Sequence, residues 1–434
     1  MRGWRSRLLR HFVAMVGVVG VFAQVALYVS RPTLAPIRSD GYSYYVYLPN
    51  WLLFHDPTLQ AAADDCCGGE YPAFTAIIRW PGTGRWVNAH PIGVAVMTAP
   101  FFGVAHGLTR WSNLPPDGFS LYYQHAVALA GLAYVLAGLA ILRRLLRRHF
   151  TDGVVLATLV ALTFGTNLFH YAVYDASYSH AFAFCLVCAL VALTDRWWRE
   201  PGWRVSAALG LVAGLIVLVR HPNALFLAVI PLAGVTGWRE IVPHARRLLD
   251  RWPQVTVIAL VAALCVLPQL ALYRQATGSW LVSAYGSLGF PYLGSPRIAG
   301  VLVGVQKGLF FWSPILLLAV AGFLVPTPWS RRWRLPAAAV FVLLTYIIAS
   351  WHDWQFGGSF GHRGYTDGLG LLAPFLASFF AWSSGRRRMG TGVAVVAGLL
   401  VTLSVLQMLQ YWLGILPIMD TTWEQYTRLF LRFS

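Results

Sequence analysis

The hydrophobic positions of the chain fall into long runs, separated by short polar or arginine-rich segments. A membrane-spanning helix needs about 20 mostly apolar residues, and many of the runs approach this length. The pattern therefore predicts an all-α polytopic membrane protein with about 11 transmembrane helices. The predicted spans are residues 11–30, 120–142, 153–174, 178–195, 205–220, 222–238, 254–273, 308–326, 336–351, 368–384 and 391–413.

A further apolar segment, residues 91–109, is long enough to span but is predicted to lie in the membrane interface, or to enter and return. Counting it as a span would place the arginine clusters at 143–148 and 386–388 outside, against the tendency of basic loops to face inward. Pro91 and Pro100 suit an irregular segment that is buried against protein.

The composition agrees with this class of protein. Of the 434 residues, 57% are hydrophobic and 11% are charged, whereas about a quarter are charged in soluble domains. These values exclude a disordered chain, a collagen and a disulfide-stapled secreted domain. They also argue against nucleic-acid binding as the reason for the net charge of +17.

The basic residues set the predicted orientation. On this topology, 21 of the 33 basic residues but only five of the 16 acidic residues lie on the inner side. The amino terminus is then inside and the carboxyl terminus outside. Residues 1–434 form a single membrane domain whose long outer loops are 31–119, which carries juxtamembrane helices, 274–307 and 352–367. Function is therefore predicted at the outer face.

The first outer loop holds the strongest acidic candidate. Asp40 follows the first span and precedes a tyrosine-rich stretch that includes Tyr44 and is predicted as an amphipathic helix. An acid so close to a membrane is costly unless it is partnered or used, which favours a functional Asp40. In His55-Asp56-Pro57, the polar residues are expected either to cap the next turn or to line a substrate cleft. His90-Pro91 opens the apolar segment 91–109.

Three basic residues lie on the predicted outer side, where the tendency of basic residues to face inward does not account for them. Lys307 is the only lysine in the chain and is expected either to extend toward outer headgroups or to bind a phosphate. Arg220, at a helix break, is expected to bind phosphate or to pair with an acid such as Asp175 or Asp353. Arg363 belongs to a glycine-rich cluster that also holds His352, Asp353 and His362. This cluster is either a plain turn or a ligand-binding loop.

The cysteines add little. Cys66 and Cys67 are adjacent in a polar loop, where a bridge or a bare pair of thiols is favoured over a metal site. The sequence implies no particular cofactor. No motif supports a divalent metal, and the question of a metal requirement stays open.

On these motifs the chain resembles the GT-C membrane glycosyltransferases, a superfamily that includes the protein O-mannosyltransferases, the lipid A aminoarabinose transferases and the bacterial Rgt-like group. The resemblance is carried by an uncleaved first span, Asp40 on a juxtamembrane helix, and His90-Pro91 before a second such helix. Gly308-Leu309-Phe310-Phe311-Trp312-Ser313-Pro314 and Gly358-Ser359-Phe360-Gly361-His362-Arg363 also look like segments of bacterial members. Several members have Asp-Glu where this chain has Asp40-Gly41, so the metal requirement stays open.

The resemblance implies an inverting transfer of a sugar from a polyprenyl-phosphate donor to a hydroxyl at the outer face, with Asp40 as the general base. The acceptor is a lipid, a glycan or a protein. Lys307, Arg363 and Arg220 would hold the donor phosphate. The residues expected to contact the sugar or the acceptor are Tyr44, His55, Asp56, His90, His352, Asp353 and His362.

The preference for arginine over lysine suggests a bacterium, and hence its cytoplasmic membrane. The alternative function is a multi-pass transporter or flippase for a lipid-linked or anionic substrate. It is less favoured because the sequence has no internal repeat and its acids and histidines crowd the outer loops.

Overall fold

The structure is a computed structural model, and it describes residues 2–31, 34–72, 75–283 and 288–433. Within these ranges the chain is predominantly helical, with one short hairpin. Among the described residues, six helices are long and apolar enough, by length and composition, to cross a membrane. They are α1 (Arg2–Ser30), α6 (Leu121–Leu146), α9 (Ser179–Arg199), α13 (Trp252–Thr277), α17 (Pro328–Ser350) and α19 (Arg387–Trp412).

The other predicted spans coincide with shorter or interrupted helices. They are α7 (Asp152–Phe164) with α8 (Leu168–Val173), α10 (Trp203–Val219), η2 (His221–Ala228) with α11 (Val229–Leu232), α15 (Leu309–Trp312) with α16 (Leu316–Gly322), and α18 (Leu369–Ser384). Pro222 and Pro314 account for two of the breaks, because proline disfavours helical backbone in the residue before it. The all-α membrane fold is thus confirmed, whereas the count of eleven spans is not.

The segment between α1 and α6 forms a separate cap on the bundle. It contains α2 (Asp40–Tyr45), α3 (Tyr47–Leu52), α4 (Gln60–Cys67), the antiparallel strands β1 (Ile77–Arg79) and β2 (Trp86–Asn88), and α5 (Gly93–Arg110). Cys66 and Cys67 form a disulfide at the end of α4, one of the two expected states. Tyr45 and Phe102 lie in the buried apolar cluster that joins these elements.

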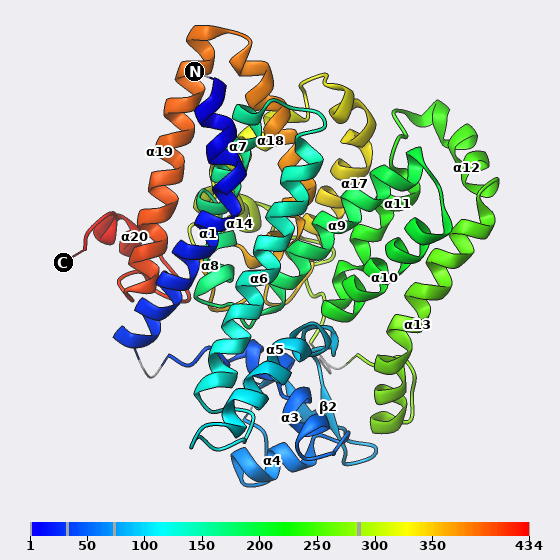
Figure 1. The fold of residues 1–434 in the computed structure, drawn as a ribbon, viewed down its shortest axis with the longest axis vertical. Coiled ribbons are helices and arrows are strands. Elements are labelled where there is room, and N and C mark those ends of the chain that lie inside the picture. The colour runs from blue at the N-terminus through cyan, green and yellow to red at the C-terminus, as the bar shows by residue number, and fades with distance from the viewer. Residues whose placement is uncertain (1, 32–33, 73–74, 284–287, 434) are drawn as a thin grey trace.

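Figure 1 places the cap at one end of the long helices and the amino terminus at the other. The turn between α18 and α19, with its arginines at 386–388, and α12 (Ile241–Leu249) also lie at the amino-terminal end. The first predicted outer loop and these predicted inner segments are therefore at opposite ends of the molecule. The remaining elements are η3 (Trp238–Glu240), α14 (Ile298–Val303), η4 (Arg363–Gly368) and α20 (Trp423–Leu429).

The centre of the bundle depends on a close approach to α6. A Cβ atom added at Gly131 would lie 2.1 Å from the carbonyl oxygen of Ala176, in the turn between α8 and α9. Gly131 therefore lets this turn, which lies beneath the cap, pack directly on the α6 backbone.

We expect Gly131→Ala to destabilise the protein by about 1–3 kcal/mol, the usual cost of overpacking a core. Gly398→Ala on α19 is the matched control, because a Cβ there meets open space. Alanine favours a helix by up to about 1 kcal/mol over glycine, so this control should be neutral or stabilising. Thermal unfolding in detergent measures both, and equal melting temperatures would argue against the close approach.

Candidate active site

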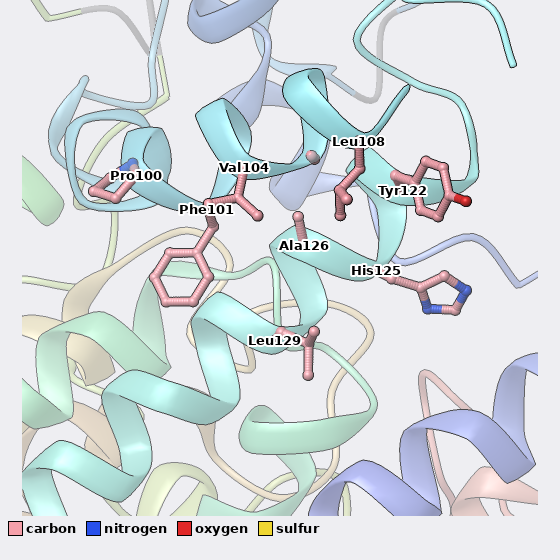
Figure 2. A pocket seen from close by; sticks show the side chains of 9 residues that line it. Pro100, Phe101, Val104, Leu108, Tyr122, His125, Ala126 and Leu129 are labelled. Carbon is pink, nitrogen blue, oxygen red and sulfur yellow. The ribbon is translucent and has the colours of Figure 1, made fainter. Parts of the chain in front are cut away.

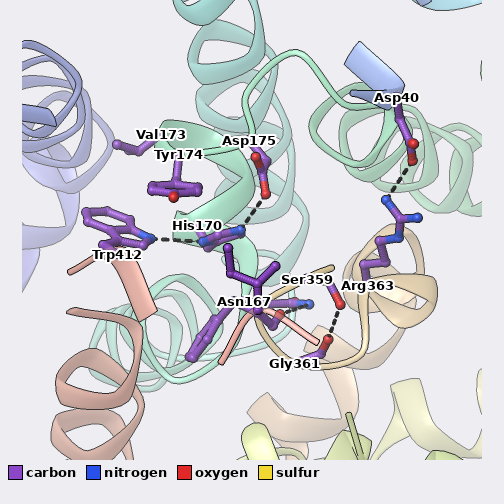
Figure 3. Close-up of polar contacts among 12 residues, drawn as sticks. Asp40, Asn167, His170, Val173, Tyr174, Asp175, Ser359, Gly361, Arg363 and Trp412 are labelled. Carbon is purple, nitrogen blue, oxygen red and sulfur yellow. Dashed lines mark hydrogen bonds and ion pairs between the residues drawn. The ribbon is translucent and has the colours of Figure 1, made fainter. Parts of the chain in front are cut away.

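Asp40 is the first residue of α2 and forms an ion pair with Arg363. The Asp40 Oδ2 atom accepts a hydrogen bond from Arg363 Nη1 at 2.6 Å (Figure 3). The Asp40 side chain is 26% exposed and that of Arg363 17%. The structure thus brings together two residues that were selected separately from the sequence.

The local backbone holds Asp40 in place. Ser39 has a φ of 48°, in the left-handed region that residues other than glycine rarely adopt. Gly41 packs so closely on the turn before α9 that an added Cβ would lie 1.9 Å from Ser177 Oγ. Only glycine fits at this position, which gives a packing reason for the Asp40-Gly41 pair in this chain.

The electrostatics of the pair keep Asp40 ionised. Burial raises the pKa of this carboxyl group, but Arg363 outweighs it and, with a smaller contribution from His90, lowers the pKa to about 2. The pKa of Arg363 is raised, because Asp40 more than offsets the effect of burial. While the pair is intact, Asp40 is therefore charged but weakly basic.

His90 and Tyr44 lie on the same side of the site. Their rings meet edge to face with centroids 4.5 Å apart, and both side chains are buried. His90 Nδ1 is buried without a hydrogen-bond partner in the described structure. Burial lowers the His90 pKa to about 4, so the ring is neutral near pH 7. A neutral imidazole with an unsatisfied nitrogen beside Asp40 is suited to bind a polar ligand group.

Lys307 is a buried cation. It is 2% exposed, and its Nζ atom donates to the backbone carbonyl oxygens of Ser359 and, at 2.8 Å, of Ile418. The Tyr411 ring centroid lies 5.8 Å from Nζ. Lys307 has no ion pair with a carboxylate in the described part of the chain. Burial and the nearby Arg363 lower its pKa to about 8.

The glycine-rich loop that carries Arg363 is tightly folded. Phe356, Gly357 and Gly361 all have positive φ angles. His362 is 2% exposed, its Nε2 atom is 2.9 Å from the Trp354 carbonyl oxygen, and burial lowers its pKa to about 3. The loop is stabilised by internal contacts, and it presents Arg363 to Asp40.

Two further candidates in this loop are used locally. Asp353 Oδ1 accepts from the backbone N–H of Gly357 at 3.2 Å, and the His352 ring packs on Trp351 with centroids 4.5 Å apart.

In the cap, Asp56 accepts from the backbone N–H groups of Thr58 and Ala61, so it caps the turn that leads into α4. This was one of its two expected roles. His55, beside it, is exposed.

Arg220 is paired with an acid that was not anticipated. Arg220 Nη1 donates to Asp367 Oδ2 at 2.9 Å, rather than to Asp175 or Asp353. Asp367, 0% exposed, also accepts from Asn223 Nδ2 at 2.8 Å and lies 2.7 Å from His180 Nδ1. Because Arg220 already has a fully buried counter-charge, Lys307 is better placed to receive a new anion.

The described residues contain no group of three His, Cys, Asp or Glu side chains that could hold a metal ion. Asp40 has a cationic partner rather than a second acid beside it.

Two apolar grooves lie beside α5. The first, of about 460 Å³, lies between α5 and α6, where Phe101, Val104 and Leu108 face Ala126 and Leu129 (Figure 2). The second, of about 690 Å³, lies between the start of α5, α10 and α13, and its lining includes Ile92, Val96, Leu218, Leu264 and Pro268. In sequence, Ile92 is two residues from His90, and Leu218 is two residues from Arg220.

No family model matches the chain, and no curated protein matches it significantly. The chain is similar in structure to the archaeal oligosaccharyltransferase AglB from Archaeoglobus fulgidus, solved with an inhibitory peptide and a dolichol-phosphate. The TM-score is 0.46 with 10% identity, over 98% of this chain and 60% of that one. The chain therefore spans about 60% of the length of the protein it matches.

We expect Asp367→Asn to destabilise the protein by about 3–5 kcal/mol, because it removes the fully buried carboxylate that pairs with Arg220, whose side chain is only 18% exposed. The control is Asp152→Asn, which breaks an ion pair with Arg147 whose side chains are 27% and 57% exposed. Exposed pairs contribute at most about 1 kcal/mol. Thermal unfolding compares the two, and a loss for Asp367→Asn no larger than the control would show that its buried pair is dispensable.

Proposed function

We propose that the protein is a membrane glycosyltransferase that moves a sugar from a polyprenyl-phosphate donor to an acceptor hydroxyl at the outer face. The observation that carries this proposal is the partly buried Asp40–Arg363 pair, whose nearby buried cation, Lys307, has backbone carbonyls but no carboxylate as hydrogen-bond partners in the described structure. A base, an anion-binding cation and a neutral polar histidine are the groups that such a transfer needs.

The donor phosphate binds Lys307 and Arg363. Lys307 approaches the loop of Arg363 through the Ser359 carbonyl, and Arg363 is close enough to lower the pKa of Lys307. An ammonium and a guanidinium side by side stabilise the negative charge that develops on the phosphate as it leaves. Arg220, while paired with Asp367, adds to the positive electrostatic potential around the phosphate.

Donor binding also activates the base. Asp40 is a poor proton acceptor while Arg363 holds its pKa near 2. A phosphate on Arg363 offsets the positive charge that acts on Asp40, which makes the carboxylate more basic. The acceptor hydroxyl then gives its proton to Asp40 as its oxygen bonds to the anomeric carbon. The bond from that carbon to the phosphate oxygen breaks, and polyprenyl phosphate leaves with the electron pair.

The lipid chain of the donor lies in the groove between α5, α10 and α13. This groove is apolar and follows the candidate span α13, and its lining residues Ile92 and Leu218 are two positions in sequence from His90 and Arg220. The acceptor enters from the cap side, where His90 and Tyr44 contact it.

We expect Asp40→Asn to reduce sugar transfer by at least about 100-fold, the usual contribution of a general base. The assay uses purified protein in vesicles with polyprenyl-phosphate sugars and measures product formation. Asp65→Asn changes an exposed acid of α4 and should retain full activity. Undiminished transfer by Asp40→Asn would remove Asp40 as the base. Movement of the donor across the vesicle without any transfer would instead favour a flippase or transporter.

The affinity for polyprenyl phosphate is expected to fall about tenfold as pH rises through about 8, because Lys307 loses its proton there. The phosphate itself does not titrate in this window, since its second pKa is about 6. Lys307→Met should bind weakly with no such pH dependence, whereas Arg79→Gln, at an exposed ion pair with Glu70, should keep the wild-type profile. A flat wild-type profile between pH 7 and 9.5 would contradict a role for Lys307.

A further inference from the structure

The residues on both sides of Asp40 are anchored to one short segment, residues 174–178. Arg38 Nη2 donates to the Tyr174 carbonyl oxygen at 2.7 Å and to Asp175 Oδ1 at 2.8 Å. Gly41 packs against Ser177 of the same segment. Asp40 thus lies between two fixed points, and the backbone just before it is held in a rarely adopted conformation.

Asp175 is itself oriented by two further residues. It is 5% exposed, and its Oδ2 atom is 2.8 Å from His170 Nε2 (Figure 3). Trp412 Nε1 donates to His170 Nδ1 at 2.9 Å. Because an indole N–H can only donate, His170 Nδ1 carries no proton, and the ring is neutral with its proton on Nε2. Both oxygens of Asp175 therefore have a fixed donor.

The neighbouring residues of this segment also hold the loop of Arg363. Asn167 Nδ2 donates to the Phe360 carbonyl oxygen at 3.4 Å, and Asn167 Oδ1 accepts from Thr366 Oγ1 at 3.0 Å. Tyr411, next to Trp412, places its ring 5.8 Å from Lys307 Nζ. One stretch of chain, residues 166–178, therefore contacts the segments that carry both partners of the ion pair, and the end of α19 lies against the buried lysine.

We propose that Asp175, oriented by His170 and Trp412, is a positioning residue that fixes Asp40 relative to Arg363 for sugar transfer. This inference rests on the proposed function. Asp175 does not touch the reacting atoms; it acts through Arg38, two residues before the base. Since displacement of a reacting group by about 1 Å can cost about 100-fold in rate, such an anchor affects turnover more than donor binding.

The first test is kinetic. Asp175→Asn cannot accept from both Arg38 and His170, because one end of an amide is a donor. We expect kcat to fall about 10- to 100-fold, with the donor KM within about threefold of wild type. Trp412→Phe keeps the ring but removes the indole N–H, and should lower kcat about threefold. Asp152→Asn, at the exposed ion pair with Arg147, should match wild type.

A double-mutant cycle separates positioning from general structural damage. In an Asp40→Asn background, Asp175→Asn should cause no further loss of the residual transfer, because the group that it positions is already absent. An equal loss in both backgrounds, or wild-type kcat in Asp175→Asn, would overturn the inference.

A second measurement does not depend on activity. Hydrogen exchange of the peptide that covers residues 36–45 should become faster in Asp175→Asn and, to a smaller extent, in Trp412→Phe, but not in Asp152→Asn. If Asp40→Asn retains full transfer, the proposed function fails and this exchange result alone decides the inference. Unchanged exchange in both Asp175→Asn and Trp412→Phe would show that the network does not hold Asp40, whatever the chemistry.

Discussion

The ion pair between Asp40 and Arg363 is the constraint on which the rest of the site depends. It joins side chains 323 positions apart in the sequence, so two loops from opposite parts of the chain must meet within hydrogen-bond distance. Separating this partly buried pair would leave two charges without partners, so the position of each segment depends on that of the other. The surrounding structure meets this condition with Arg38, Gly41 and Asn167, which anchor both loops to residues 166–178.

Among the described charges around this pair, Lys307 is the cation that no ion pair compensates, although Asp420 raises its pKa from a longer distance. Arg38 with Asp175, Asp40 with Arg363, and Arg220 with Asp367 are three neutral pairs. His90 and His362 are neutral near pH 7, because burial lowers the pKa of each well below its usual value. Lys307 is left with backbone carbonyls as its hydrogen-bond partners in the described structure. Since an uncompensated buried charge is unfavourable, an incoming anion would stabilise this arrangement.

The sequence predicts the long helices well and the interactions of the site only in part. The runs 120–142 and 178–195 correspond closely to Leu121–Leu146 and Ser179–Arg199, because apolar length is a property of a local segment. The break at Pro314 was missed, since mean apolarity does not register the loss of one helical hydrogen bond. Arg363 and Lys307 could be predicted as phosphate-binding candidates because they are basic residues on the predicted outer side, where membrane orientation does not require them. However, Asp367, the partner of Arg220, is 147 positions away, and no local pattern could indicate it.

The guanidinium group of one arginine has enough N–H donors to bind a carboxylate and a phosphate at the same time. Arg363 contacts Asp40 through Nη1 alone, whereas a guanidinium carries five N–H donors in a planar fork. In the proposed reaction, a phosphate can therefore reach Arg363 without first displacing Asp40. The two anions then share one positive charge, and the carboxylate becomes more basic in proportion to the phosphate charge that is present. The proton affinity of the base thus follows occupancy of the donor site, so an acceptor that arrives before the donor meets only a weak base.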